Sequence, residues 1–322
     1  MGARVIDAIK AAEAVCRKHL NVQPGEEVVI VVDQDTDLEM AYALAGVVQS
    51  VGAEYTIAMM PTRADREANV LTRFIDKGLE AADVLIGLTK SSGAPCYSAV
   101  AQKRYYDKKM RSISMVLRSL NHFTRGGATA DYDQMAEVAE KLAAIWRAGR
   151  EIRVTSAKGT DLRAPIVPDR VRIESGFATK AGEECAFSDG EVYMYPTAGA
   201  DGIVIVDGPL YKLGLPSEPV RLEVAGGRVV RILGKGRSCA QLQRIVASVP
   251  NADNFAEIAV GINPASLRNG DFEEEKKALG NVHVAVGKMP TVYSAIHMDL
   301  VVYDCTVAID GKVIVQDGEL KL

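Results

Sequence analysis

The residues best suited to chemistry in this sequence lie near its C-terminal end, in an apolar and β-branched run that also contains a histidine and an aspartate. His297 and Asp299 are two positions apart in the run Ala295–Val302. The run predicts a strand, in which residues two apart point to the same face. The two side chains should therefore project together, and an imidazole beside a carboxylate is a common beginning of a metal site.

Three more polar side chains occupy similar settings. His283 lies in the apolar run 281–287, Glu257 is the one carboxylate of the run 256–262, and Glu191 follows the turn Asp189-Gly190. Each has an ordinary alternative: a hydrogen-bonded core histidine, a paired buried acid, or a solvated surface acid for Glu191. A carboxylate in an apolar strand is costly to bury unless it is paired or bound to a metal. Together with the first pair, these residues make a set of three carboxylates and two imidazoles: Glu191, Glu257, His283, His297 and Asp299. Such a set could hold two divalent ions, with one carboxylate bridging them.

Composition narrows the class of protein. The 322 residues are 48% hydrophobic and 25% charged with a net charge of −4, which gives no support to nucleic acid or an anionic membrane as a partner. No apolar run approaches the roughly 20 residues that a membrane-spanning helix needs. The five cysteines are odd in number and widely spaced, which favours reduced thiols. We expect a cytoplasmic protein that acts on a small molecule or a short peptide.

The first half alternates predicted helices and strands. Helices are expected over 3–20, 36–52, 66–77, 98–109 and 131–148, and strands over 27–33, 54–59, 83–88 and 112–116. This alternation is typical of a doubly wound α/β domain. No glycine-rich phosphate loop follows the first strand, where Asp33-Gln34-Asp35-Thr36-Asp37 stands instead. We interpret that stretch as a solvated, acidic helix start with a capping box from Thr36 to Glu39.

After the long helix the pattern changes to short strands with glycine-rich turns. Hairpins are predicted around Gly226-Gly227 and Asp310-Gly311, and two helices around 240–247 and 272–279. The expected fold is therefore α/β, with a doubly wound α/β domain over 1–155 and a β-rich α+β domain over 156–322. The second domain carries the candidate metal site.

Five segments of the second half resemble the metal-binding half of the thermophilic aminopeptidase T family of metallopeptidases. The matching segments are Gly159–Leu162, Asp189–Val192, Glu257–Gly261, His283–Gly287 and His297–Asp299. The resemblance implies a homodimer whose C-terminal domain binds two divalent ions through Glu191, Glu257, His283, His297 and Asp299. It also implies a tyrosine that polarises the substrate carbonyl, for which Tyr293 is the nearest candidate. The fold is similar to that of 2,5-dihydroxypyridine 5,6-dioxygenase as well.

These resemblances lead to two enzymatic hypotheses. The first is a metallohydrolase of aminopeptidase type with two zinc, cobalt or manganese ions, in which Glu191 is a ligand or the general base. The second is a ring-cleaving dioxygenase with one iron(II), held by His283, His297 and either Asp299 or Glu257. The number of available ligands favours the hydrolase. A protein that binds without catalysis, with these groups paired only to each other, is the third alternative.

Overall fold

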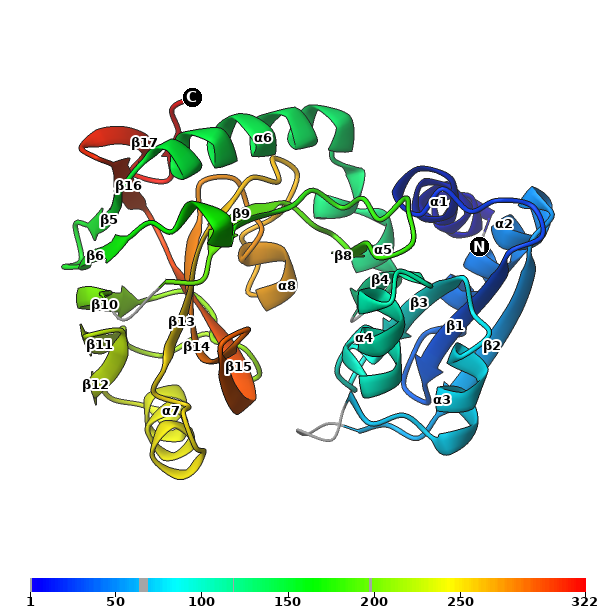
Figure 1. Cartoon of the computed structure of the whole chain (residues 1–322), viewed down its shortest axis with the longest axis horizontal. Helices are drawn as coiled ribbons and strands as arrows, with labels where there is room; N and C mark the ends of the chain where they lie inside the picture. The colour runs from blue at the N-terminus through cyan, green and yellow to red at the C-terminus, as the bar shows by residue number, and fades with distance from the viewer. Residues whose placement is uncertain (1, 64–68, 118, 197–198) are drawn as a thin grey trace. The chain divides into compact units, whose positions relative to one another are not determined.

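The chain divides into two compact units, and the first is built on a parallel sheet. The computed structural model describes residues 2–63, 69–117, 119–196 and 199–322. The first unit is Met1–Thr129 with Gly176–Asp189, and the second is Ala130–Ser175 with Gly190–Leu322. The sheet order in the first unit is β2-β1-β3-β4-β8 with every pairing parallel (Figure 1), for strands β1 (Glu27–Asp33), β2 (Glu54–Met60), β3 (Val84–Thr89), β4 (Arg111–Val116) and β8 (Glu184–Ala186).

Helices cover both faces of this sheet. They are α1 (Gly2–Glu13), the π-helix η1 (Ala14–His19), α2 (Leu38–Val51), α3 (Arg73–Leu79), η3 (Pro95–Tyr97), α4 (Ala99–Tyr106), α5 (Leu120–Thr124) and η4 (Gly126–Thr129). Val28, Ile30 and Val32 of β1 pack with α1, α2 and α5, whereas Val31 packs with α3 and α4. A strand buried on both faces needs such a continuous apolar run. The predicted doubly wound α/β arrangement is confirmed.

Three local predictions in this unit need correction. The helix expected over 3–20 turns into the π-helix at Ala14, and the side chains of Val5, Ile6 and Ile9 are exposed. The helix expected from residue 66 begins at Arg73, and residues 64–68 lie outside the described residues.

The acidic stretch after β1 is also different from its prediction. The N-cap of α2 is Asp37, which accepts a hydrogen bond from the Glu39 amide. Asp33 is fully buried, and its carboxylate accepts hydrogen bonds from the Ser91 and Ser92 amides and the Thr36 hydroxyl. Burial raises the pKa of Asp33, but these hydrogen bonds outweigh it and hold the pKa below its ordinary value. Asp33 therefore orders the loop after β3 and is not a solvated acid.

The second unit contains two antiparallel sheets. The 8-stranded sheet has the order β12-β11-β10-β6-β5-β16-β17-β18, and the 5-stranded sheet has the order β15-β14-β13-β9-β7. The first comprises β5 (Glu151–Ser156), β6 (Asp161–Pro165), β10 (Asp201–Val206), β11 (Val220–Ala225), β12 (Arg228–Leu233), β16 (Cys305–Ile309), β17 (Lys312–Gln316) and β18 (Glu319–Leu320). The second comprises β7 (Val171–Glu174), β9 (Glu191–Met194), β13 (Phe255–Gly261), β14 (Val282–Met289) and β15 (Val292–Val302).

Both predicted hairpins are present as β11–β12 and β16–β17. At the second turn Asp310 and Gly311 have positive φ angles of 47° and 84°, which suits an Asp-Gly turn between antiparallel strands. The helices of this unit are α6 (Tyr132–Ala148), η5 (Pro168–Arg170), α7 (Arg237–Ser248) and α8 (Phe272–Glu275). The predicted β-rich α+β half is confirmed.

The division into units differs from the single boundary predicted near residue 155. Helix α6 packs on β7 and β9 and belongs with the second unit, while the later segment 176–189 returns to the first unit and adds β8 beside β4. Sequence patterns do not reveal such a return, because it depends on long-range strand pairing.

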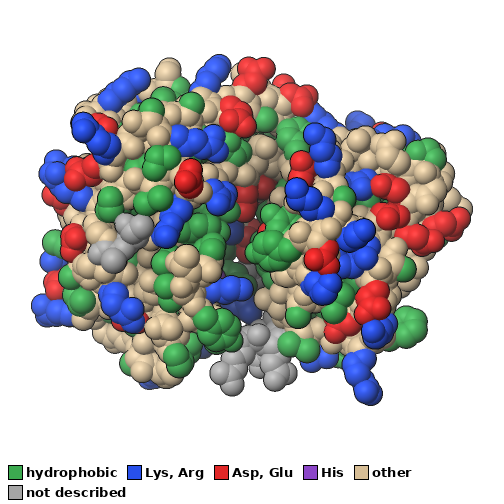
Figure 2. All heavy atoms as spheres, viewed as in Figure 1, with side chains coloured by type: hydrophobic (Ala, Val, Ile, Leu, Met, Phe, Trp, Pro, Cys, Tyr) green, Lys and Arg blue, Asp and Glu red, His purple; other side chains and the backbone are tan. Residues whose placement is uncertain are grey.

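Among the described residues, no helix is long and apolar enough to cross a membrane. Basic and acidic side chains are interspersed over the visible face in Figure 2. All five cysteines are buried and none forms a disulfide.

Candidate metal centre

The 5-stranded sheet brings the five predicted metal ligands to one of its faces. Glu257, Ala259 and Gly261 alternate along β13 and so share a face. Residues directly opposite across a strand pair also share a face. Three pairings then bring in the ligands of the neighbouring strands, as Gly261 with Glu191, Ala259 with His283, and Ala285 with Asp299. His297 lies two positions before Asp299 and joins the same face.

Small residues separate these ligands. Glu191 lies opposite Gly261, Glu257 and Asp299 lie opposite Ala285, and His297 lies opposite Gly287. Alanine and glycine have side chains too short to fill the space above the sheet. The ligating groups can therefore lean toward one another, instead of packing against bulky neighbours.

The side chains form two clusters that share Glu257, and within each cluster the candidate ligand atoms lie within 4.8 Å of one another. The inner cluster is Glu191, Glu257 and His283, where His283 Nε2 is 3.3 Å from a carboxylate oxygen of each glutamate. The outer cluster is Glu257, His297 and Asp299, where His297 Nε2 is 3.0 Å from Asp299 Oδ1 and 3.7 Å from Glu257 Oε2. Among the described residues no such cluster contains both histidines.

Backbone carbonyls orient both imidazoles. His283 Nδ1 donates to the Lys276 carbonyl at 3.1 Å, and His297 Nδ1 donates to the Lys288 carbonyl at 2.8 Å. A carbonyl oxygen can only accept, so each Nδ1 carries a proton and each Nε2 faces the carboxylates. Metal-binding histidines are held in this way by groups beyond the ion.

The clusters are buried, and they leave polar atoms without hydrogen bonds. Glu191, Glu257, His283 and Asp299 are all buried, whereas the His297 side chain is 35% exposed. Three buried atoms of the clusters have no hydrogen-bond partner in the described part of the chain: Glu191 Oε2, His283 Nε2 and Asp299 Oδ1. Buried polar atoms are rarely left unpaired. Converging oxygen and imidazole atoms without partners are what a divalent cation would satisfy, so the residues fit a metal ion.

The charges of the clusters shift their own pKa values. Burial lowers the pKa of His297, but the Asp299 and Glu257 carboxylates outweigh it and raise that pKa to about 9. Burial acts on His283 in the same direction, and Glu191 and Glu257 raise its pKa above the ordinary value. Burial raises the pKa of Asp299, yet Lys276 and His297 hold it well below the usual range. The carboxylates of this sheet face therefore favour positively charged groups beside them.

Two lysines that sequence reasoning did not assign also reach the clusters. Lys277 Nζ lies 2.8 Å from Glu191 Oε1, and Lys276 Nζ lies 3.2 Å from Asp299 Oδ2. Burial lowers the pKa of Lys276, but Glu273 and Asp299 raise it above its ordinary value. The sequence predicted a helix over 272–279 and gave these lysines no role. That prediction is wrong because α8 ends at Glu275 and the following backbone binds β13.

Tyr193 is a further residue that the sequence prediction did not include. It follows Glu191 by two positions on β9 and faces Ala259, so it shares the face of the clusters. Its ring contacts that of Tyr195 edge to face, with centroids 5.3 Å apart. Burial, with Glu174 nearby, raises the pKa of Tyr193 well above its ordinary value, which keeps the phenol protonated. Strand alternation from Glu191 was the signal that could have found it.

Two predicted site residues differ in their exposure to solvent. Glu191 begins β9, as the turn before it predicted, and it is 4% exposed, so its ordinary alternative of a solvated surface acid does not apply. Tyr293 is 79% exposed, and its backbone carbonyl accepts a hydrogen bond from the Asn251 side chain. The catalytic role of Tyr293 stays a prediction.

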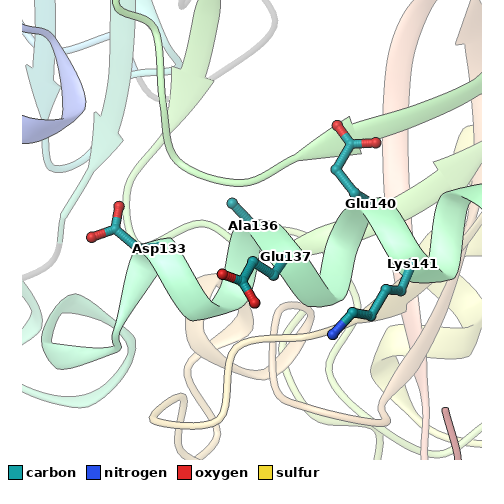
Figure 3. Close-up of a pocket in the computed structure, with 5 residues that line it drawn as sticks. All are labelled: Asp133, Ala136, Glu137, Glu140 and Lys141. Atoms are coloured by element: carbon teal, nitrogen blue, oxygen red, sulfur yellow. The ribbon is translucent and has the colours of Figure 1, made fainter.

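A second acidic group lies on α6 and is separate from both clusters. Five residues of this helix line a hollow, namely Asp133, Ala136, Glu137, Glu140 and Lys141, and Figure 3 shows their side chains projecting from the helix. Side chains three and four positions apart on a helix are neighbours. The hollow therefore follows from helix geometry and contains none of the candidate ligands.

Comparisons with known proteins cover nearly the whole chain. The NicX family model, 2,5-dihydroxypyridine 5,6-dioxygenase, matches residues 7–322. The structure of 2,5-dihydroxypyridine dioxygenase from Pseudomonas putida KT2440 is similar, with a TM-score of 0.78 and 17% identity over 100% of this chain and 98% of that one. Wild-type AmpT from Thermus thermophilus is also similar, with a TM-score of 0.72 and 16% identity over 98% of this chain and 99% of that one. No curated protein matches the sequence.

Proposed function

We propose that this chain, which belongs to the 2,5-dihydroxypyridine 5,6-dioxygenase family, is a metal-dependent dioxygenase that opens the ring of a dihydroxypyridine. The observation that supports this most directly is the family match together with a buried sheet face whose ligand atoms lack partners. The proposed reaction cleaves the ring bond between C5 and C6 and adds both atoms of O2 to the product.

The metallohydrolase of aminopeptidase type predicted from the sequence is wrong. The family model that matches residues 7–322 is that of the dioxygenase. The likeness to AmpT, at 16% identity, extends to the fold alone. Counting ligands misled the prediction, because carboxylates beyond those that bind an ion can serve as bases or as partners of lysines.

We assign one divalent ion, iron(II), to the outer cluster. Glu257, His297 and Asp299 would hold it, and the exposed side of His297 leaves that cluster accessible to substrate and O2. A bound ferrous ion would supply the one-electron chemistry that ground-state O2 requires. This assignment replaces the set of two histidines and one carboxylate expected from sequence, because the two histidines belong to different clusters.

The remaining residues of the face handle the substrate. Glu191 Oε2 is buried without a hydrogen-bond partner, so it can accept the proton that a ring hydroxyl loses on binding. Tyr193 presents an aromatic ring on the same face, against which a flat heteroaromatic ring can pack. His283, oriented by the Lys276 carbonyl, keeps Nε2 between Glu191 and Glu257, 3.3 Å from a carboxylate oxygen of each.

Anaerobic reconstitution with iron(II), followed by 2,5-dihydroxypyridine and air-saturated buffer, tests the proposal. We expect one O2 consumed for each ring lost, measured with an oxygen electrode and by ultraviolet absorbance. The protein treated with chelator should be inactive and should recover when iron(II) returns. Iron-loaded protein that consumes no O2 with any dihydroxypyridine isomer would disprove the proposed function.

A further inference from the structure

Lys277 is a buried lysine whose ammonium group contacts the inner cluster. Its side chain is 2% exposed, and its Nζ lies 2.8 Å from Glu191 Oε1 and 2.9 Å from Glu174 Oε2. Lysine is almost never fully buried unless it is paired. The ammonium group therefore neutralises carboxylates at the inner end of the face.

The backbone delivers this lysine to the inner cluster. After α8 the Lys277 carbonyl accepts a hydrogen bond from the Asn263 amide at 2.9 Å. The segment lies so close to β13 that a Cβ at Gly261 would be 2.7 Å from the Lys277 carbonyl carbon and 2.3 Å from the Ala278 oxygen. Gly261 in turn lies opposite Glu191. The backbone of Lys277 is thus held in place by its close contact with the sheet.

The two clusters differ in the positive charge already present. The inner cluster has a buried ammonium on Glu191, and this ammonium also binds Glu174 outside the cluster. A divalent ion on Glu191 would lie about 2.1 Å from a carboxylate oxygen. It would therefore lie within a few ångströms of Lys277 Nζ and be repelled strongly. In the outer cluster, Lys276 contacts Asp299 Oδ2, but its side chain is 18% exposed against 2% for Lys277, so solvent screens its charge more.

We propose that the ammonium group of Lys277 takes the place of a second metal ion in the inner cluster. The chain then binds one ion, in the outer cluster, and Lys277 is a positioning residue that keeps Glu191 free of metal and available as a base. This inference depends on the metal site of the proposed function but not on the reaction or its substrate. It explains why a face with enough ligands for two ions carries a lysine among them.

Metal counting tests the inference without any assay of activity. Manganese(II) is titrated into chelator-treated protein by equilibrium dialysis, and bound metal is measured by mass spectrometry. The native chain should bind one ion. Lys277→Met should bind two, with the second site tightened on the order of 100-fold because a like charge a few ångströms away is gone. Electron paramagnetic resonance should then detect a coupled manganese pair, since Glu257 belongs to both clusters.

Two controls separate charge from general damage. Lys277→Arg keeps the positive charge and should still bind one ion. Lys321→Met removes an exposed lysine that pairs with Glu319 at 2.8 Å, and it should also bind one. Two ions in the native chain, or a single ion in a folded Lys277→Met variant with an unchanged circular dichroism spectrum, would overturn the inference.

A second variant decides the matter if Lys277→Met does not fold. Glu191→Gln removes a carboxylate that belongs only to the inner cluster. It should retain one manganese ion with nearly native affinity, whereas loss of the ion would contradict the inference. A native chain that binds no divalent ion would instead contradict the metal site of the proposed function itself.

Discussion

At the scale of single residues, the centre depends on which side chains share one face of a sheet. The spacing of His297 and Asp299, and the apolar settings of Glu257 and His283, were enough to predict the residues that the structure brings together. Lys277 could not be predicted in the same way. Its position depends on where α8 ends and on the absence of a side chain at Gly261, and neither is visible in local sequence patterns.

Replacing His297 by alanine should remove the ion. His297 supplies one of three ligands of the outer cluster, and loss of a ligand should weaken binding by at least about 100-fold, more than loss of a group that only orients a ligand. Metal content after dialysis against dilute manganese(II) measures this directly. His122→Ala is the control, because His122 lies in α5 of the first unit. If the His122 variant lost the metal and the His297 variant kept it, the assigned centre would be wrong.

At the scale of elements, close contacts between backbone segments determine where a helix ends and how an acidic side chain is bound, and sequence patterns do not predict these contacts. The run 272–279 has the composition of a helix, but α8 ends at Glu275. The residues after it form backbone hydrogen bonds with Asn263, which follows β13. Asp33 shows the same effect in the first unit. Its neighbours made it look like a solvated helix start, yet the folded backbone turns the amides of Ser91 and Ser92 toward it.

Gly261→Ala should destabilise the second unit and disturb the inner cluster together. The added Cβ would lie 2.3 Å from the Ala278 oxygen, so the segment that carries Lys277 must shift. Overpacking of this kind costs about 1–3 kcal/mol, which urea unfolding measures. Gly46→Ala is the matched control. Gly46 lies inside α2 with no atom within 4 Å of an added Cβ, so alanine there should stabilise by about 1 kcal/mol. Equal effects at the two positions would refute the argument.

At the scale of the whole molecule, repeated patterns predicted the architecture, but the reaction required more. Alternating helices and strands, then glycine-rich hairpins, indicated a parallel sheet followed by antiparallel ones, and both are present. The reaction was predicted wrongly. Hydrolases and dioxygenases can use the same ligand types, and the choice depends on which ligands an ion occupies and on the substrate. Neither of these follows from the spacing of Glu191, Glu257 and the histidines.

The predicted homodimer has a candidate contact surface on α1. Val5, Ile6 and Ile9 are 49%, 55% and 44% exposed, and they follow helical spacing. An apolar helix stripe of this kind is typical of a surface that packs against a partner. We expect light scattering after gel filtration to give about twice the chain mass of 34.6 kDa, and Ile6→Glu to halve it. A monomeric native chain, or an Ile6→Glu variant that remains dimeric, would exclude this surface as the contact.

The response of the whole chain to acid should depend on one ion pair that joins distant segments. Arg111 on β4 binds Glu26 at 2.6 Å, and it also donates to the backbone carbonyls of Leu20 and Asn21. Burial raises the pKa of Glu26, but Arg111 outweighs this and holds that pKa below its ordinary value. A carboxylate with a lowered folded pKa stabilises fully above its unfolded pKa of about 4.3. That stability is lost as the pH falls through the folded pKa.

Glu26→Gln should therefore lower the free energy of unfolding by about 3 kcal/mol at pH 7, since it leaves the buried Arg111 charge without a countercharge. The difference from the native chain should shrink as the pH falls below about 4, where native Glu26 itself becomes protonated. Urea unfolding of chelator-treated protein at both pH values isolates this effect from metal binding. Glu80→Gln is the control, because Glu80 pairs with Lys77 on the surface and should change stability by less than about 1 kcal/mol at either pH. A Glu26→Gln deficit that stays constant from pH 7 to pH 3 would show that the lost stability does not come from the charge of Glu26.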